Sequence, residues 1–269
     1  MKTRILSACI MLPLLLFVYF GGIPLECACL MIGIMGAREL IKGFEAMDIH
    51  GDFGYAVIGA LALYCTGIIA KPCSAGHMKL LVLWFFLATI CALLLMFVGK
   101  RHEKPEGSMV NMLSLFYIVF FSYHVYLTDQ AGEFRILIWL IFITAFGTDI
   151  FAYFTGYAIG KHKLCPSISP KKTVEGAIGG ALGSIALCLL FGYFFAPQYL
   201  MHCAVIGLLG AIISQFGDLT ASIFKRRMGI KDYGNLIPGH GGIMDRFDSI
   251  LFTAPLVYYF VQFVNLLGK

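Results

Sequence analysis

The chain has 269 residues, of which 59% are hydrophobic and only 13% are charged, and its net charge at pH 7 is +5. Soluble domains carry about a quarter charged residues, so this composition excludes an ordinary water-soluble protein and indicates an integral membrane protein. The nine cysteines lie mostly in apolar stretches, which argues against a disulfide scaffold or a cysteine-based metal framework.

The N-terminal stretch begins with Lys2 and Arg4 and continues as an apolar run, as a signal peptide would. No small-x-small cleavage site follows this run. The next residues are Ile23-Pro24-Leu25-Glu26, after which hydrophobicity resumes. We therefore expect a retained first membrane span.

Nine stretches along the chain are apolar enough to cross a membrane, which takes about 20 residues. Because the backbone in lipid must satisfy its own hydrogen bonds, and because the alternation of a membrane barrel is absent, each should be a helix. The Gly-rich run from Gly176 to Gly183 should allow one of these helices to pack closely on a neighbour. The predicted spans are 4–21, 23–40, 53–70, 79–98, 109–127, 135–158, 174–195, 201–221 and 247–266.

The distribution of Lys and Arg gives an independent test of this count. If nine spans alternate, one set of connections holds the N-terminus and the linkers after spans 2, 4, 6 and 8. Of the 20 Lys and Arg residues, four fall in the other set: Lys71, Lys79, Arg135 and Lys269. Basic residues gather on the cytoplasmic side of membrane proteins. The bias therefore predicts a cytoplasmic N-terminus and an external C-terminus.

We expect residues 1–269 to form a single integral membrane domain. Within it, residues 1–130 would provide N-terminal helices for anchoring and for lipid access. Residues 131–269 would provide the catalytic helices, including a long polar and glycine-rich block at 222–248. A block with this many charges has no lipid-facing role and points to an anionic substrate associated with a metal ion.

Five acids lie near the predicted cytoplasmic ends of spans. Asp245 and Asp248 are three residues apart and share one face of a helix. Carboxylates gathered in this way are best held together by a cation, and oxygen ligands next to a phosphate suit Mg²⁺. The five acids are Asp149, Glu175, Asp218, Asp245 and Asp248.

Basic residues and glycines accompany these acids. Lys225, Arg226, Lys231 and Arg246 could hold phosphates, and Gly241-Gly242 lets the backbone approach a ligand closely. These parts together indicate phosphoryl or nucleotidyl transfer. Plainer interpretations stay open: a lipid-headgroup cluster at Lys225–Arg227, a structural role for His240, and a helix-to-helix hydrogen bond for Asp149.

The block from Ser222 to Asp248 resembles the signature of phosphatidate cytidylyltransferases, also called CDP-diacylglycerol synthases. The matching positions are Ser222, Phe224, Lys225-Arg226, Lys231-Asp232, Gly234, Ile237-Pro238, His240-Gly241-Gly242-Ile243 and Asp245-Arg246-Phe247-Asp248. A second stretch is also similar to the family: Asp149, Ala152-Tyr153, Gly156, Gly160–Leu164, Pro166, Ser169-Pro170, Lys172-Thr173 and Glu175-Gly176. The Gly217-Asp218 pair resembles the family's glycine and aspartate before the signature.

The resemblance implies an all-α polytopic membrane protein that forms a homodimer. It would lie in the inner membrane, with a polar cavity open to the cytoplasm. It also implies transfer of CMP from CTP to phosphatidic acid, giving CDP-diacylglycerol and pyrophosphate, with Mg²⁺. On this basis Asp218 and Asp245 are the expected metal ligands, and Asp248 is a third ligand or serves a second cation. Lys172, Lys225, Arg226, Lys231 and Arg246 would hold phosphates, and His240 would orient a phosphate or an acid.

Two other functions remain in view from the sequence. A cation or proton transporter could also carry buried acids, but the acids gather at one face and no inverted repeat is visible. A related transferase acting on another lipid phosphate would use the same headgroup chemistry. Membrane lipids are expected around the chain, and a nucleic-acid partner is not.

Overall fold

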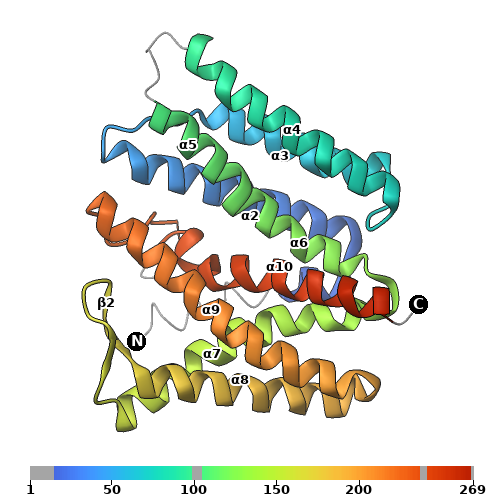
Figure 1. Cartoon of the computed structure of the whole chain (residues 1–269), viewed down its shortest axis with the longest axis vertical. Coiled ribbons are helices and arrows are strands. Elements are labelled where there is room, and N and C mark those ends of the chain that lie inside the picture. Colours follow the sequence, from blue (N-terminus) through green and yellow to red (C-terminus); the bar gives the residue numbers. More distant parts are fainter. Residues whose placement is uncertain (1–14, 99–104, 237–240, 268–269) are drawn as a thin grey trace. The chain divides into compact units, whose positions relative to one another are not determined.

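The computed structural model describes residues 15–98, 105–236 and 241–267. Within these ranges the chain is almost entirely helical, as predicted (Figure 1). The α-helices include α2 (Gly22–Glu45), α3 (Phe53–Ile69), α4 (Ala75–Val98), α5 (Pro105–Leu113), α6 (Phe121–Asp129), α7 (Ile138–Ile159), α8 (Val174–Phe195), α9 (Leu200–Met228) and α10 (Met244–Leu267). A π-helical turn, η1 (Ser114–Phe120), joins α5 to α6, and the short 3₁₀ turns η2 (Gly132–Leu137) and η3 (Pro197–Tyr199) precede α7 and α9.

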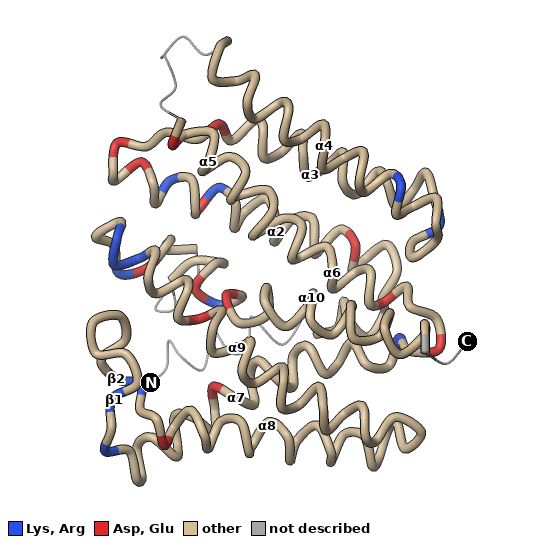
Figure 2. Tube along the Cα trace, in the orientation of Figure 1, with Lys and Arg blue, Asp and Glu red and all other residues tan. Residues whose placement is uncertain are grey.

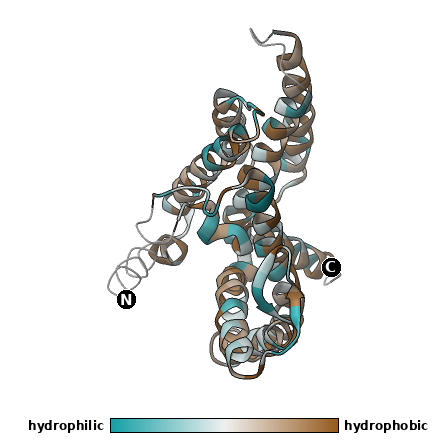
Figure 3. Ribbon diagram, turned by 90° about the vertical axis from the view of Figure 1, so that its left-hand side faces the viewer, coloured by the Kyte–Doolittle hydropathy of each residue, from teal (hydrophilic) through white to brown (hydrophobic). Residues whose placement is uncertain are grey.

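These helices coincide with the second to ninth predicted spans, whereas most of the predicted span 4–21 lies outside the described residues. Six helical segments of the described chain are long and apolar enough to cross a membrane. Helix α3 is apolar but has only 17 residues. The helical membrane class is therefore supported, and the number of nine spans stays a prediction. Figure 3 shows hydrophobic residues along most of the helices.

The chain divides into two compact units. The first contains residues 1–130 and 227–246, and the second contains residues 131–226 and 247–269. The described residues of the segment 227–246, which makes up most of the signature block, thus pack with the N-terminal helices. Helix α10 begins in the first unit and continues in the second.

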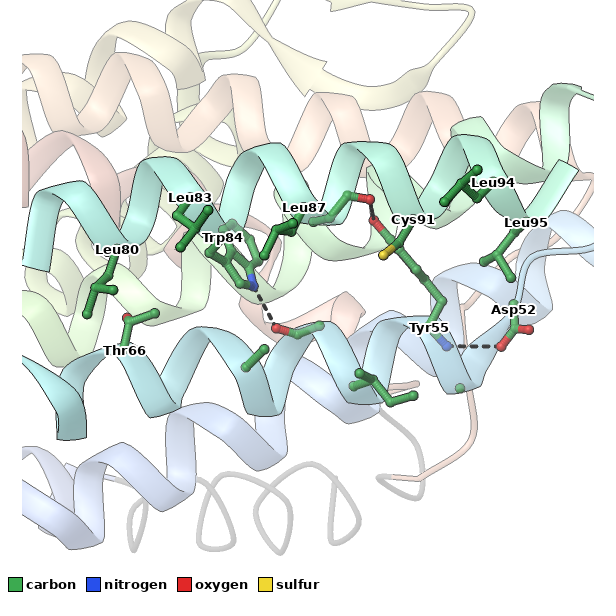
Figure 4. A pocket seen from close by; sticks show the side chains of 15 residues that line it. Asp52, Tyr55, Thr66, Leu80, Leu83, Trp84, Leu87, Cys91, Leu94 and Leu95 are labelled. Atoms are coloured by element: carbon green, nitrogen blue, oxygen red, sulfur yellow. Dashed lines mark hydrogen bonds between the residues drawn. The ribbon is translucent and has the colours of Figure 1, made fainter.

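In the first unit, α2 contacts α3, η1 and α6. Small residues allow this packing: a Cβ at Gly36 would lie 2.8 Å from the side chain of Ile118 in η1. Between α3 and α4 the packing is looser and leaves an apolar cavity of about 650 Å³ (Figure 4). Trp84 of α4 spans this gap, and its indole Nε1 donates to the Gly59 carbonyl at 2.9 Å.

In the second unit, α7 and α8 pack along their lengths (Figure 1). The glycines at the start of α8, from Gly176 to Gly183, face α7: a Cβ at Gly180 would lie 2.8 Å from the Thr148 carbonyl oxygen. This confirms the predicted close packing of the Gly176–Gly183 run. Thr253 of α10 donates to the Ile141 carbonyl of α7 at 3.2 Å, and Ser184 of α8 donates to the Gly207 carbonyl of α9 at 3.0 Å.

A small β-hairpin joins α7 to α8, where the sequence had indicated only a basic linker. Strands β1 (Lys163–Cys165) and β2 (Ser169–Thr173) pair antiparallel, with Lys163 opposite Thr173. Thr173 then caps α8, its hydroxyl accepting from the Gly176 amide at 3.1 Å. Figure 2 shows basic residues both in this hairpin and at the end of α9. The hairpin therefore presents a fixed group of lysines to its own unit.

Candidate active site

The second unit brings together acids from three helices. Asp248, in the first turns of α10, is 8% exposed, and its Oδ1 accepts from the Ser249 amide at 2.7 Å. Its carboxylate is close enough to Asp149 of α7 and Asp218 of α9 to be repelled by both, and it is attracted by Lys225. Three of the five acids singled out in the sequence, together with one predicted phosphate-binding lysine, therefore form one electrostatic cluster.

Glycine before aspartate has a structural reason here. A Cβ at Gly217 would lie 2.6 Å from the Asp248 carbonyl oxygen, so α9 can touch the backbone of α10 only because residue 217 has no side chain. Ser249 reinforces this contact by donating to the Ser214 carbonyl at 3.3 Å. The close approach sets Asp218 and Asp248 on adjoining helices.

Lys172 of the hairpin forms an ion pair with Asp218 Oδ2. Both side chains are about one-quarter exposed, which leaves the pair partly open to solvent. The hairpin is held near the end of α9 by a second contact, because Arg226 Nε donates to the Ile168 carbonyl at 3.2 Å. Lys172 and Arg226 thus come from separate elements to one side of the second unit, and their phosphate-binding role stays a prediction.

A cavity of about 480 Å³ opens beside this cluster. Asp149 lines it, as do three lysines of the hairpin, Lys163, Lys171 and Lys172. Two exposed tyrosines of α7 also line it, Tyr153 and Tyr157, whose rings are stacked with 17° between their planes. The cavity therefore combines cationic groups, a carboxylate and aromatic faces, a combination suited to a nucleotide with its phosphates.

Glu175 does not join the acid cluster as a free carboxylate. It reaches back from the first turn of α8 to the hairpin, where it accepts from the amide of Lys161 at 3.1 Å and from the ring Nδ1 of His162 at 2.6 Å. Its function in this structure is to fix the start of the hairpin. The sequence did not assign the hairpin lysines Lys163 and Lys171 to phosphate binding, although Lys163 lies in a stretch that resembles the family.

Asp245 lies in the first unit, where it fastens the described part of the loop between α9 and α10, residues 229–236 and 241–243, called the signature loop below. Its Oδ2 accepts from the amides of Tyr233 at 2.8 Å and Gly242 at 3.0 Å. Gly241 adopts a left-handed backbone with φ of 85°, and a Cβ there would lie 2.7 Å from the same oxygen. The metal-binding role expected for Asp245 stays a prediction, and the observed role is to shape the loop.

The other predicted residues of the first unit are placed as follows. Lys231 is exposed and Arg246 is half-buried in the first turn of α10. Gly242 is buried, with its open side facing the carboxylate of Glu39 from α2. His240 lies outside the described residues. The sequence analysis did not single out Glu39. The one signal that could have identified it is its position as an acid inside the predicted span 23–40.

No group of three or more His, Cys, Asp or Glu side chains within residues 15–98, 105–236 and 241–267 is arranged to hold a metal ion by itself. Magnesium often takes only one or two carboxylates and completes its shell with water and substrate phosphates. The acids of the second unit are enough to supply one or two such carboxylates.

Known proteins match the chain over nearly its whole length. The model of the cytidylyltransferase family matches residues 2–264. A phosphatidate cytidylyltransferase of Staphylococcus haemolyticus is 33% identical over 264 residues, which are 95% of each chain. Proteins with the same name from Bacillus subtilis (30% identical, 96% of this chain and 97% of the relative) and Brucella abortus (34% identical, 97% and 93%) are also similar.

Proposed function

The chain belongs to the cytidylyltransferase family, and from this premise we propose that it transfers CMP from CTP to phosphatidic acid. The products are CDP-diacylglycerol, a precursor in phospholipid synthesis, and pyrophosphate. The observation that carries the proposal is the similarity over nearly the full length to proteins named phosphatidate cytidylyltransferase. It favours a transferase over the transporter that the buried acids alone would also allow.

The reaction takes place at the acid cluster and the cavity of the second unit. A phosphate oxygen of phosphatidic acid attacks the α-phosphorus of CTP, a new P–O bond forms, and the bond to the leaving pyrophosphate breaks. The nucleophile is already an anion, so the chain need not supply a strong base. The main catalytic tasks are to bring two polyanions together and to align the attack.

Hairpin lysines perform the first of these tasks. Lys172, with Lys163 and Lys171 on the same cavity wall, holds the triphosphate, and Lys225 offsets negative charge next to Asp248. The ion pair between Lys172 and Asp218 keeps this lysine at the cluster before the nucleotide arrives. Arg226, at the end of α9 in the same unit, adds a further cation. The phosphate-binding roles expected for Lys231, Arg246 and the Gly241-Gly242 backbone stay predictions from the sequence.

The acid cluster fits Mg²⁺. Its donors are carboxylate oxygens, the ligands that this hard cation prefers. The ion pair between Lys172 and Asp218 supports this proposal, because a cation already contacts this carboxylate. Asp218 and Asp248 would hold the ion, with Asp149 beside them. When bound, Mg²⁺ would neutralise charge on the triphosphate.

The proposal includes a location and an assembly. We place the chain in the inner membrane as a homodimer, with the hairpin and the acid cluster facing the cytoplasm, where CTP is available. The bias of Lys and Arg toward one set of connections supports this orientation.

The test is pyrophosphate release by the purified chain in detergent micelles containing phosphatidic acid. We expect release only when CTP and phosphatidic acid are both present, with CDP-diacylglycerol formed in equal amount. A polyprenyl phosphate and an archaeal ether-lipid phosphate serve as comparison acceptors. Faster release with either of them would reassign the acceptor lipid, and no release with any acceptor would refute nucleotidyl transfer.

A further inference from the structure

We propose that Glu39, in the N-terminal helix α2, is a positioning residue for the signature loop and the start of α10. Its side chain carries two hydrogen bonds across more than 200 positions of sequence. Glu39 Oε1 accepts from the Ile243 amide at 3.0 Å, and Oε2 accepts from the Met244 amide at 2.8 Å. Both amides lie where α10 begins.

The start of α10 needs such a partner. The first amides of a helix have no acceptor within the helix, and a Ser, Thr, Asp or Asn just before it usually supplies one. Here the residue before the helix is Ile243, whose side chain cannot accept a hydrogen bond. Glu39 provides the missing acceptors from another helix, and its negative charge also suits the positive end of the α10 dipole.

Two glycines of the signature make room for this carboxylate. A Cβ at Gly242 would lie 2.4 Å from both Glu39 oxygens, and one at Gly234 would lie 2.6 Å from Oε1. Contacts as short as these cannot exist with a side chain in place, so alanine at either position would displace Glu39. Close approach of Glu39, rather than only of substrate, therefore accounts for glycine at both positions.

The same face of α2 supports the loop on either side of Glu39. One turn earlier, a Cβ at Gly36 would lie 3.7 Å from the Met244 side chain, and one turn later, a Cβ at Gly43 would lie 2.7 Å from the Met228 sulfur. Helix α2 thus contacts Met228 and Met244, at the two ends of the segment that joins α9 to α10. The first turn of α10 carries Asp245 and Arg246, so Glu39 fixes the position of the backbone from which these two side chains extend.

A consequence follows for phosphate binding, and this part of the inference rests on the proposed function. Helix N-termini commonly bind anions through their free amides. At α10 the Met244 amide and the Ile243 amide before it already donate to Glu39, and the Arg246 amide donates to the Ile243 carbonyl. Substrate phosphates are therefore expected to contact side chains here rather than the helix end. Removing Glu39 should therefore impair alignment more than affinity.

The test compares Glu39→Gln and Glu39→Ala with Glu45→Gln, an exposed acid at the end of the same helix. Hydrogen–deuterium exchange of the full chain in nanodiscs reports directly on the loop. Among the described residues, we expect faster exchange confined to 229–236 and 241–246. The effect should be modest for Gln, which keeps one acceptor, and larger for Ala. Glu45→Gln should match the wild type. Unchanged exchange in both Glu39 variants would overturn the proposal.

Kinetics separate positioning from a general loss of structure. We expect kcat to fall about tenfold for Glu39→Gln and about 10²-fold for Glu39→Ala, with the KM for CTP nearly unchanged. Gly234→Ala should lower kcat similarly, and combining it with Glu39→Gln should add little further loss, because both disturb one contact. Full additivity would contradict the inference. Because the exchange measurement requires no turnover, it stands even if the proposed reaction is wrong.

Discussion

At the scale of single residues, the most consequential contact is the ion pair between Lys172 and Asp218. It joins a hairpin to a helix more than 40 positions away and places a cation on a carboxylate that we propose to hold a metal. Partly exposed ion pairs contribute little to folding stability, because water and salt screen them. A site role therefore explains the pair better than a stabilising one.

Asp218→Asn should reduce kcat at least about 10²-fold, because the loss of a metal-holding carboxylate removes several kcal/mol of transition-state stabilisation. Pyrophosphate release at limiting Mg²⁺ measures this effect. Glu133→Gln, an exposed acid of η2 in the same unit, is the matched control and should keep full activity. Near-normal turnover of the Asp218 variant would remove this residue from the site.

Asp245 shows what a motif alone leaves open. Sequence spacing and family resemblance both pointed to a metal ligand, whereas the structure shows Oδ2 accepting from two backbone amides of the signature loop. A carboxylate can serve loop and substrate at once, since each oxygen accepts more than one hydrogen bond. The sequence pattern could indicate that Asp245 has a role in the site, but not which of its oxygens already accepts hydrogen bonds from the loop.

At the scale of elements, the glycine run of α8 determines how the second unit packs. Its positions Gly176, Gly180 and Gly183 are buried, and Gly179 lies beside Thr155 of α7, where a Cβ would come within 2.2 Å of the Thr155 hydroxyl. Lipid tails are as apolar as the helix surfaces, so close van der Waals packing drives such association. This packing holds Asp149 of α7 beside the hairpin that α8 follows.

Gly180→Val should destabilise the protein by about 1–3 kcal/mol, the usual cost of overpacking a tight contact. The added side chain would meet the Thr148 carbonyl, a backbone atom that cannot rotate away. Thermal unfolding in detergent measures the loss. Leu182→Val, on the exposed side of the same helix, should be nearly neutral. Equal stability of the two variants would show that α7 and α8 tolerate a wider spacing.

The hairpin itself was not predicted. Strands of three and five residues that include Pro170 and several lysines lack the alternation by which strands are recognised. What organises them is Glu175, whose carboxylate binds the amides of Lys161 and His162. A contact of this kind, between an acid and the backbone of the turn before it, is not predicted by any pattern of strand residues in the sequence.

At the scale of the whole molecule, the orientation in the membrane is a prediction from the distribution of charge. The connections rich in Lys and Arg should face the cytoplasm. Single-cysteine variants test this: one that keeps only Cys165, in the hairpin, and one that keeps only Cys73, before α4. In intact cells a membrane-impermeant thiol reagent should label Cys73 and spare Cys165, and inverted membrane vesicles should give the opposite result. The reverse labelling would refute a cytoplasmic site.

The sequence by itself determined the membrane class, the positions of the helices and the segment that carries the signature. These depend on composition and on hydrophobic runs of about 20 residues, which are local properties of the chain. The family resemblance likewise required only the order of residues in two short stretches.

Only the tertiary structure decided which side chains meet. Asp149, Asp218 and Asp248 come from three helices, and Glu39 holds a loop near the other end of the chain. Such contacts depend on where glycines let backbones touch, and that depends on the packing of helices distant in sequence. A pattern along one chain carries the identity of these residues but not the distances between them.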